Sequence, residues 1–169
     1  VKAVAEGIRI GKDLFGGEIE EEIEEISGKQ LIGINEDVTL YGLNGEEIEL
    51  KVKVDTGADS SSIDTKVAEK LGYGEIIEAF KQLPIPEHID REQGLILLEK
   101  YKIDLLSKFE LLDNIDLIKS SHGFSLRPYV KIKCKLRDVV YEPKANIFDR
   151  KHLHFMMIIG RKSLDQFLV

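Results

Sequence analysis

The residues with the clearest chemical potential lie in the string VKVDTGADSSSI, over residues 52–63. Apolar residues alternate with lysines up to Asp55, which predicts a half-buried strand that ends at a carboxylate. Gly57 follows and lets the backbone turn sharply, because it has no Cβ. Thr56 carries a hydroxyl group that can link this loop to a second copy of itself. The string therefore predicts an aspartate on a tight loop, with its carboxylate directed at solvent.

An aspartate in such a loop can hydrolyse a peptide bond if a second aspartate lies at hydrogen-bonding distance. One of the two carboxyl groups then keeps a proton that the pair shares. The ionised carboxylate takes a proton from a bound water, and the protonated one donates to the substrate carbonyl oxygen. The chain has a single Asp-Thr-Gly string and no internal repeat, so the second aspartate must come from a second chain. We therefore expect a homodimer in which Asp55 meets the Asp55 of its partner.

The loop resembles the active-site loop of the retropepsin-like aspartic peptidases. The resemblance rests on Asp55-Thr56-Gly57-Ala58-Asp59 and on a second string, MMIIGR, over residues 156–161. In that family the second string is a strand that threads beside the catalytic loop, and its arginine pairs with the aspartate four residues beyond the catalytic one. The resemblance implies a mainly β, closed acid-protease barrel with added short helices. It also implies that Asp55 is catalytic and that Arg161 pairs with Asp59.

A bacterial and archaeal subfamily often labelled ATP-dependent zinc proteases is similar over more of the chain. The similarity covers about residues 31–62 and 120–169, and includes the stretch from Ser120 to Pro128. It implies that Ala58, His122 and Arg127 lie at a substrate cleft. The expected function is that of an aspartic endopeptidase that acts on a protein or peptide substrate.

The chain divides into an acidic arm over residues 1–30 and a main domain over residues 31–169. Isoleucines recur at helical spacing in EIEEEIEEI, which predicts a helix in the arm over residues 18–26. Asn44-Gly45 predicts a tight hairpin turn. Period-two patterns predict strands around residues 38–40, 48–54, 129–136, 139–147 and 153–159.

Helices are expected over residues 64–71, capped by Asp64 or Thr65, and over residues 162–169. The insert over residues 75–119 is expected to hold one helix, about residues 90–106, which Asp90 and Gln93 start as a capping box. This helix and residues 120–127 are the candidates for covering the cleft, because the chain has no glycine-rich flap.

Composition narrows the class of protein. The formal net charge of −7 argues against nucleic-acid binding, which needs clustered Lys and Arg. The basic residues over 131–137 alternate with apolar ones and predict one polar strand face. Cys134 is the only cysteine, so an intramolecular disulfide is excluded and a small core residue is expected. No apolar run approaches the roughly 20 residues of a membrane span, and we expect a cytoplasmic protein.

Two other functions stay open. One is a catalytically silent retropepsin-like module for dimerisation or peptide binding. The other is a zinc-dependent hydrolase, because His152 and His154 would share one face of a strand and His122 could join them. Nearby histidines on a strand are more often solvent-facing, and no nucleotide-binding loop is present, so no metal and no cofactor are expected.

Overall fold

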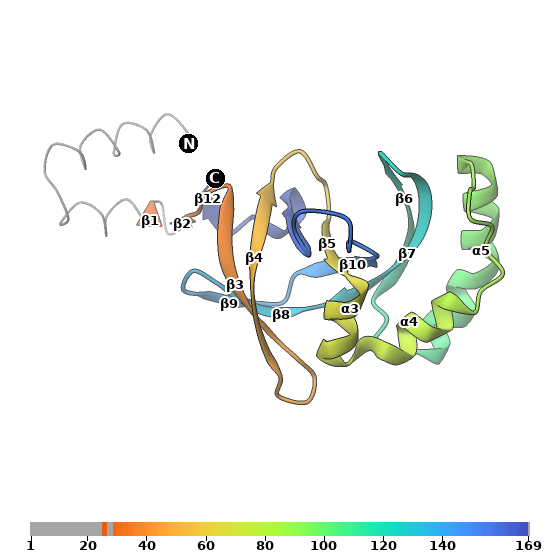
Figure 1. Cartoon of the computed structure of the whole chain (residues 1–169), viewed down its shortest axis with the longest axis horizontal. Coiled ribbons are helices and arrows are strands. Elements are labelled where there is room, and N and C mark those ends of the chain that lie inside the picture. Colours follow the sequence, from red (N-terminus) through yellow and green to blue (C-terminus); the bar gives the residue numbers. More distant parts are fainter. Residues whose placement is uncertain (1–24, 27–28, 169) are drawn as a thin grey trace, which may run out of the picture.

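The computed structural model describes residues 25–26 and 29–168, and it is mainly β (Figure 1). The strands are β1 (Glu25–Ile26), β2 (Lys29–Leu31), β3 (Asn35–Tyr41), β4 (Glu47–Asp55), β5 (Ser61–Asp64), β6 (Asn114–Ser120), β7 (Gly123–Lys131), β8 (Lys133–Leu136), β9 (Val139–Tyr141), β10 (Lys144–Phe148), β11 (Met157–Gly160) and β12 (Phe167–Leu168). The helical segments are α3 (Thr65–Ala68), η1 (Glu69–Tyr73), α4 (Gly74–Lys81), α5 (Arg91–Lys108) and η2 (Arg161–Ser163). None of these helices is long and apolar enough to cross a membrane.

Nine strands form one mixed sheet in the order β6-β7-β10-β5-β11-β4-β3-β8-β9. The pairs β4–β11 and β5–β10 are parallel, and the other pairs are antiparallel. Strand β11 therefore lies between β4 and β5, as expected for the second string. The remaining described strands form a small sheet in the order β1-β2-β12.

The sheet is open, so hydrogen bonding among the described strands does not form the expected closed barrel. Strands β6 and β9 stand at the two ends of the order. Helix α5 packs beside β6 at its end of the sheet, where a Cβ on Gly94 would meet the Leu117 side chain (Figure 1). The insert thus covers the β6 end of the sheet with a helix.

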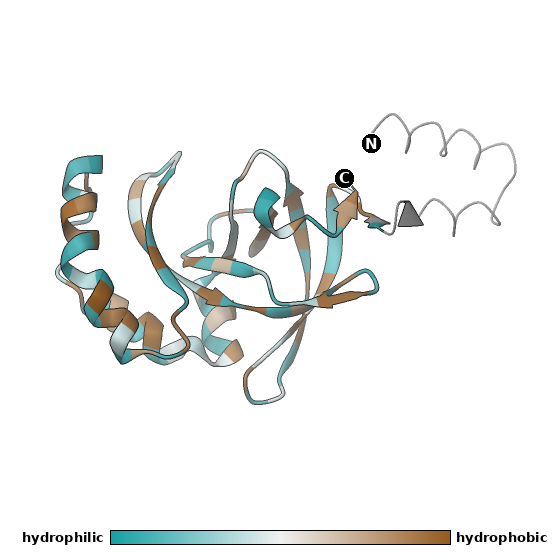
Figure 2. Ribbon diagram, turned by 180° about the vertical axis from the view of Figure 1, so that it is seen from behind, coloured by the Kyte–Doolittle hydropathy of each residue, from teal (hydrophilic) through white to brown (hydrophobic). Residues whose placement is uncertain are grey.

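Alternation along the strands produces the core. In β4, Val52 and Val54 are buried between exposed lysines, and β8 buries Cys134 and Leu136 in the same way. Figure 2 shows the resulting alternation of hydrophobic and hydrophilic positions along the strands. The basic residues of 131–137 are exposed, which confirms that they form one polar face. The Asn44-Gly45 turn is also present, but only Gly45 has a positive φ, at 89°.

Local helix signals were correct where side chains cap the backbone. Asp64 accepts a hydrogen bond from the Lys66 amide at 3.0 Å and starts α3. Asp90 and Gln93 form the expected capping box of α5, through bonds of 2.8 and 3.0 Å. The insert also contains α4 and β6, which the sequence had not predicted. Helix α4 buries only Ile76 and Ile77, so its apolar residues do not repeat often enough to reveal a helical period in the sequence.

Two expected helices are wrong where the structure describes them. Glu25–Ile26 pairs as a strand with residues 29–30, and the rest of the expected 18–26 helix lies outside the described residues. Near the C-terminus, Phe167–Leu168 pairs in parallel with β2 and is buried. Pairing between distant segments therefore outweighs the local helical spacing in both cases. The expected strand over 153–159 is also too long, because β11 begins only at Met157.

The thiol of Cys134 should be unreactive in the folded protein. Burial raises the pKa of this thiol to about 12, and the residue is fully buried. An unfolded thiol ionises near pH 8.5, so the stability that Cys134 contributes should decline as the pH rises from about 8.5 to about 12. We expect a disulfide reagent at mildly alkaline pH to label only unfolded chains. Rapid stoichiometric labelling of the native protein, or the same alkaline loss of stability in Cys134→Ala, would contradict this.

Candidate active site

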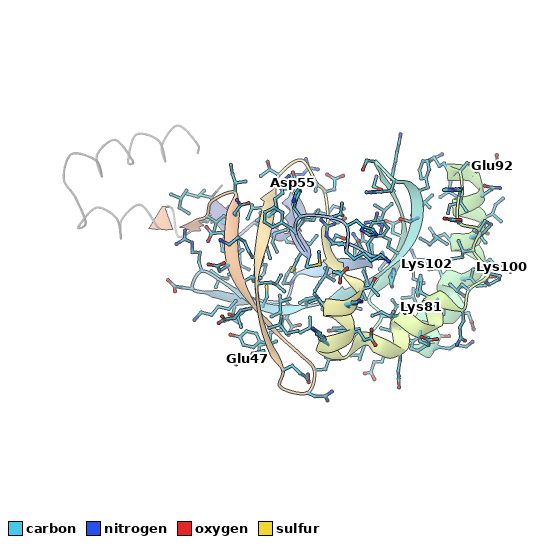
Figure 3. All side chains as sticks on the ribbon, in the orientation of Figure 1. Glu47, Asp55, Lys81, Glu92, Lys100 and Lys102 are labelled. Atoms are coloured by element: carbon cyan, nitrogen blue, oxygen red, sulfur yellow. The ribbon has the colours of Figure 1, made fainter. Side chains whose placement is uncertain are left out.

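Asp55 is the last residue of β4, at the point where the chain leaves the sheet (Figure 3). Its carboxylate accepts a hydrogen bond from the Gly57 amide at 3.0 Å, and its carbonyl accepts one from the Ala58 amide at 3.2 Å. The side chain is partly exposed, while Thr56 and Gly57 are exposed. The loop is therefore a tight turn that presents one carboxylate at the surface.

Strand β11 and the residues after it hold this loop from one side. Gly160 lies opposite Asp55 in the parallel pairing of β11 with β4. The amide of Arg161 donates to the Ala58 carbonyl at 2.7 Å, and the amide of Lys162 donates to the Asp59 carbonyl at 3.1 Å. The loop backbone is thus fixed by a segment about a hundred residues later in the chain.

Gly160 must lack a side chain for this contact to form. A Cβ built on it would lie closer than 3.0 Å to three backbone atoms of Ser60. The Gly160 amide also donates to the Ser61 hydroxyl oxygen at 3.1 Å, and that hydroxyl lies 2.7 Å from the Ser163 hydroxyl. Backbone packing and side-chain hydrogen bonds therefore join the loop to β11 and η2.

Asp59 and Arg161 are in contact, as the resemblance implies. Their side chains are 68% and 66% exposed, so solvent screens the attraction. The pair braces the rim of the loop, and it contributes no more than about 1 kcal/mol, as exposed pairs do.

A cleft of about 700 Å³ opens beside the loop. Asp55, Gly57, Ala58 and Asp59 line one side of it, and residues 116–122 of the β6–β7 hairpin line another. Strands β6 and β7 pair up to Ser120 and Gly123, and Gly123 has a φ of 94°. The hairpin therefore forms one wall of the cleft, with a single glycine near its tip. Helix α5 does not line the cleft, so its expected covering role is not fulfilled.

Polar side chains at the floor of the cleft are more numerous than the sequence suggested. Arg127 was expected there, but Tyr129, Asn146 and Arg150 were not. Tyr129 donates from its hydroxyl to Ser60 at 3.1 Å, and the Asn146 amide donates to the Ser61 carbonyl at 3.0 Å. Their positions follow from the pairing of β10 with β5 and β7, which the sequence pattern did not indicate.

The histidines are dispersed. His122 is exposed at the hairpin tip and lines the cleft, with its ring centroid 6.1 Å from that of Phe148. His152 and His154 are exposed in a turn rather than on a strand, so the expected shared face is wrong. Within residues 25–26 and 29–168, no three His, Cys, Asp or Glu side chains gather where they could hold a metal ion.

Comparison with known proteins gives little beyond this geometry. No protein-family model matches the chain, and no curated protein matches it. Among solved structures, a Legionella pneumophila protein described as Lpg0085, of unknown function (DUF785), is similar with 18% sequence identity. The match covers 80% of this chain and 87% of that one, with a TM-score of 0.40. A likeness at this level transfers neither fold nor function.

Gly160→Ala should destabilise the protein by about 1–3 kcal/mol, the usual cost of overpacking. The added methyl group meets backbone atoms of Ser60, which cannot rotate away. Chemical denaturation measures the loss. Gly33→Ala is the matched control, because a Cβ there makes only ordinary contacts, at 3.6 Å or more. Equal stability of the two variants would show that the loop and β11 are not in close contact.

Proposed function

We propose that the protein is an aspartic endopeptidase that acts as a homodimer, with one Asp55 from each chain. The observation that carries the proposal is the position of Asp55, on a braced loop in the wall of a cleft that the β6–β7 hairpin also lines. A substrate in the cleft would have a carboxylate beside it. The retropepsin-like fold belongs to this proposal, because β11 lies between β4 and β5 beside the Asp55 loop.

The need for a second chain follows from the carboxylates in the cleft. Asp59 is engaged with Arg161, and Asp116 accepts a hydrogen bond from the amide of Leu117 at 2.8 Å. Asp59 lies on the same loop as Asp55 but is held by Arg161, and Asp116 lies on strand β6, so neither offers a free second carboxylate. The exposed Thr56 and Gly57 leave the loop tip accessible to a partner. Residues of β12 stand at the end of the small sheet and offer an edge for further pairing.

The chemistry needs one proton shared by two carboxyl groups. The ionised Asp55 removes a proton from a water, whose oxygen attacks the peptide carbonyl carbon. The protonated Asp55 of the partner gives its proton to the carbonyl oxygen, which forms a tetrahedral diol. A proton then passes to the amide nitrogen, the C–N bond breaks, and an acid and an amine leave. The hydrogen bond that the Gly57 amide donates to Asp55 orients the carboxylate for these proton transfers.

The proposal predicts that Asp55→Asn abolishes peptide cleavage while the chain still folds and dimerises. Loss of the acid–base group should lower the rate by at least about 10²–10⁴-fold. Cleavage of a quenched fluorescent peptide library, measured across acidic and neutral pH, tests this. Asp37→Asn is the matched control, because it makes the same change on an aspartate side chain that is 86% exposed and outside the cleft.

Mixing the two proteins tests the shared site separately. Excess Asp55→Asn chain should suppress the activity of the wild type, because mixed dimers hold only one ionisable Asp55. Sedimentation at matched concentrations gives the oligomeric state. Full activity in a monomer, or no suppression by the variant, would exclude a dyad built from two chains. A folded dimer that binds peptides without turnover would instead support the catalytically silent module.

A further inference from the structure

Two arginines are buried at the floor of the cleft. Arg127, on β7, is 5% exposed, and Arg150, just after β10, is 8% exposed; both line the cleft with Asp55. The pKa of Arg127 is lowered to about 10, chiefly by burial; Tyr129 opposes this shift and the nearby Arg150 adds to it. Burial likewise lowers the pKa of Arg150. Two adjacent buried cations are costly unless an anion joins them.

No carboxylate within the described part of the chain forms an ion pair with either guanidinium group, although the Asp64 carboxylate opposes the lowering of the Arg150 pKa. Neither arginine has an ion pair within 4.0 Å there. Asp64 is nearby, but its two oxygens accept from the backbone amides of Lys66 and Arg150. Asp116 lies opposite Arg127 in the hairpin, yet its carboxylate accepts a hydrogen bond from the Leu117 amide instead. The positive charge at the floor of the cleft is therefore not balanced by a direct ion pair.

Both guanidinium groups are held in place with donors to spare. Arg127 donates from Nε to the Ser125 hydroxyl at 2.8 Å and from one terminal nitrogen to the Asn146 oxygen at 3.1 Å. Its guanidinium carbon lies 3.7 Å from the centre of the Phe148 ring, which fixes its plane. Arg150 uses only Nε, in a bond of 2.9 Å to the Phe155 carbonyl. A guanidinium group has five N–H donors, so most of those on Arg150 lack a described protein acceptor.

Ser62 provides an independent sign of a missing ligand. It is 2% exposed and lines the same cleft, and its hydroxyl oxygen has no hydrogen-bond partner in the described protein. Ser62 stands opposite Asn146 in the pairing of β5 with β10. A buried hydroxyl without a partner is costly, and a bound polar group would remove that cost.

We propose that Arg127, Arg150 and Ser62 form a carboxylate-binding subsite, which holds a carboxylate of the peptide substrate in the cleft that contains Asp55. The planar fork of an arginine matches a carboxylate in two parallel hydrogen bonds. The role in selecting substrates rests on the proposed peptidase function. The carboxylate belongs either to an acidic side chain or to the C-terminus of the substrate, and these two sources can be separated.

The test uses the full chain with Asp55→Asn, so that no probe is cleaved. Three fluorescein-labelled octapeptides are compared by fluorescence anisotropy: one with central glutamates and an amidated C-terminus, one with glutamines and an amidated C-terminus, and one with glutamines and a free C-terminus. We expect one carboxylate-bearing peptide to bind at least about tenfold more tightly than the amidated glutamine peptide, because charge-assisted hydrogen bonds are lost in the latter. Preference for the first identifies a side chain, and preference for the third identifies the terminus.

Arg127→Gln and Arg150→Gln, each added to that chain, should remove the preference. Arg127→Lys and Arg150→Lys keep the charge and should retain only part of it, which covers the case in which a glutamine variant does not fold. Arg91→Gln, on an exposed arginine at the start of α5, should leave it unchanged. Circular dichroism and thermal melting report whether each variant folds.

Equal binding of all three peptides, or no measurable binding of any, would overturn the subsite. So would a preference that survives in folded arginine variants. Selective binding by the Asp55→Asn chain together with no cleavage by the wild type would overturn the peptidase and keep the subsite. Cleavage by the wild type without any preference for a carboxylate would keep the peptidase and overturn the subsite.

Discussion

Strand β11 passes between two strands that the chain connects directly, and the contact it makes there has no room for a side chain. The loop that carries Asp55 leaves β4 and enters β5, but β11 lies between these strands. Gly160 packs on the Ser60 backbone, and the next two amides bind the carbonyls of Ala58 and Asp59. Because backbone groups make these contacts, the loop cannot shift without breaking the sheet. The direction of the Asp55 carboxylate, the Asp59–Arg161 contact and one wall of the cleft all depend on this packing.

The three serines after the loop show how the sheet divides polar groups between its two faces. Ser61 points toward Gly160 and Ser163 and joins β5 to the segment after β11. Ser60 accepts from Tyr129, and Ser62 faces the cleft without a partner. Alternation along a strand places neighbouring side chains on opposite sides. A serine run can therefore brace a loop and furnish a binding surface together.

Local signals in the sequence predicted the parts that neighbouring residues determine. Alternation revealed β4 and β8, and the capping box located the start of α5. The position of β11 beside the Asp55 loop was predicted from the family resemblance alone. Four apolar residues before a glycine do not indicate which strands they pair with. Sequence patterns missed β12 because its partner β2 lies far along the chain, and they missed β6 because the expected strand at 129–136 left out the residues from Gly123 with which β6 pairs. Arg150 was missed for the same reason: the β5–β10 pairing brings it beside Asp64 and into the cleft, and spacing alone cannot show such pairings.

The charges around the cleft differ in how much solvent they meet, and this difference separates framework from binding surface. Asp59 and Arg161 are exposed and satisfy one another, so a ligand gains little by approaching them. Arg127 and Arg150 are buried and face the same hollow from different segments, β7 and the end of β10. An anion held by both would link the β6–β7 hairpin to the segment after β10. Because Arg127 belongs to the strand that supports the hairpin tip, a bound anion would restrain the hairpin as well as fill the cleft.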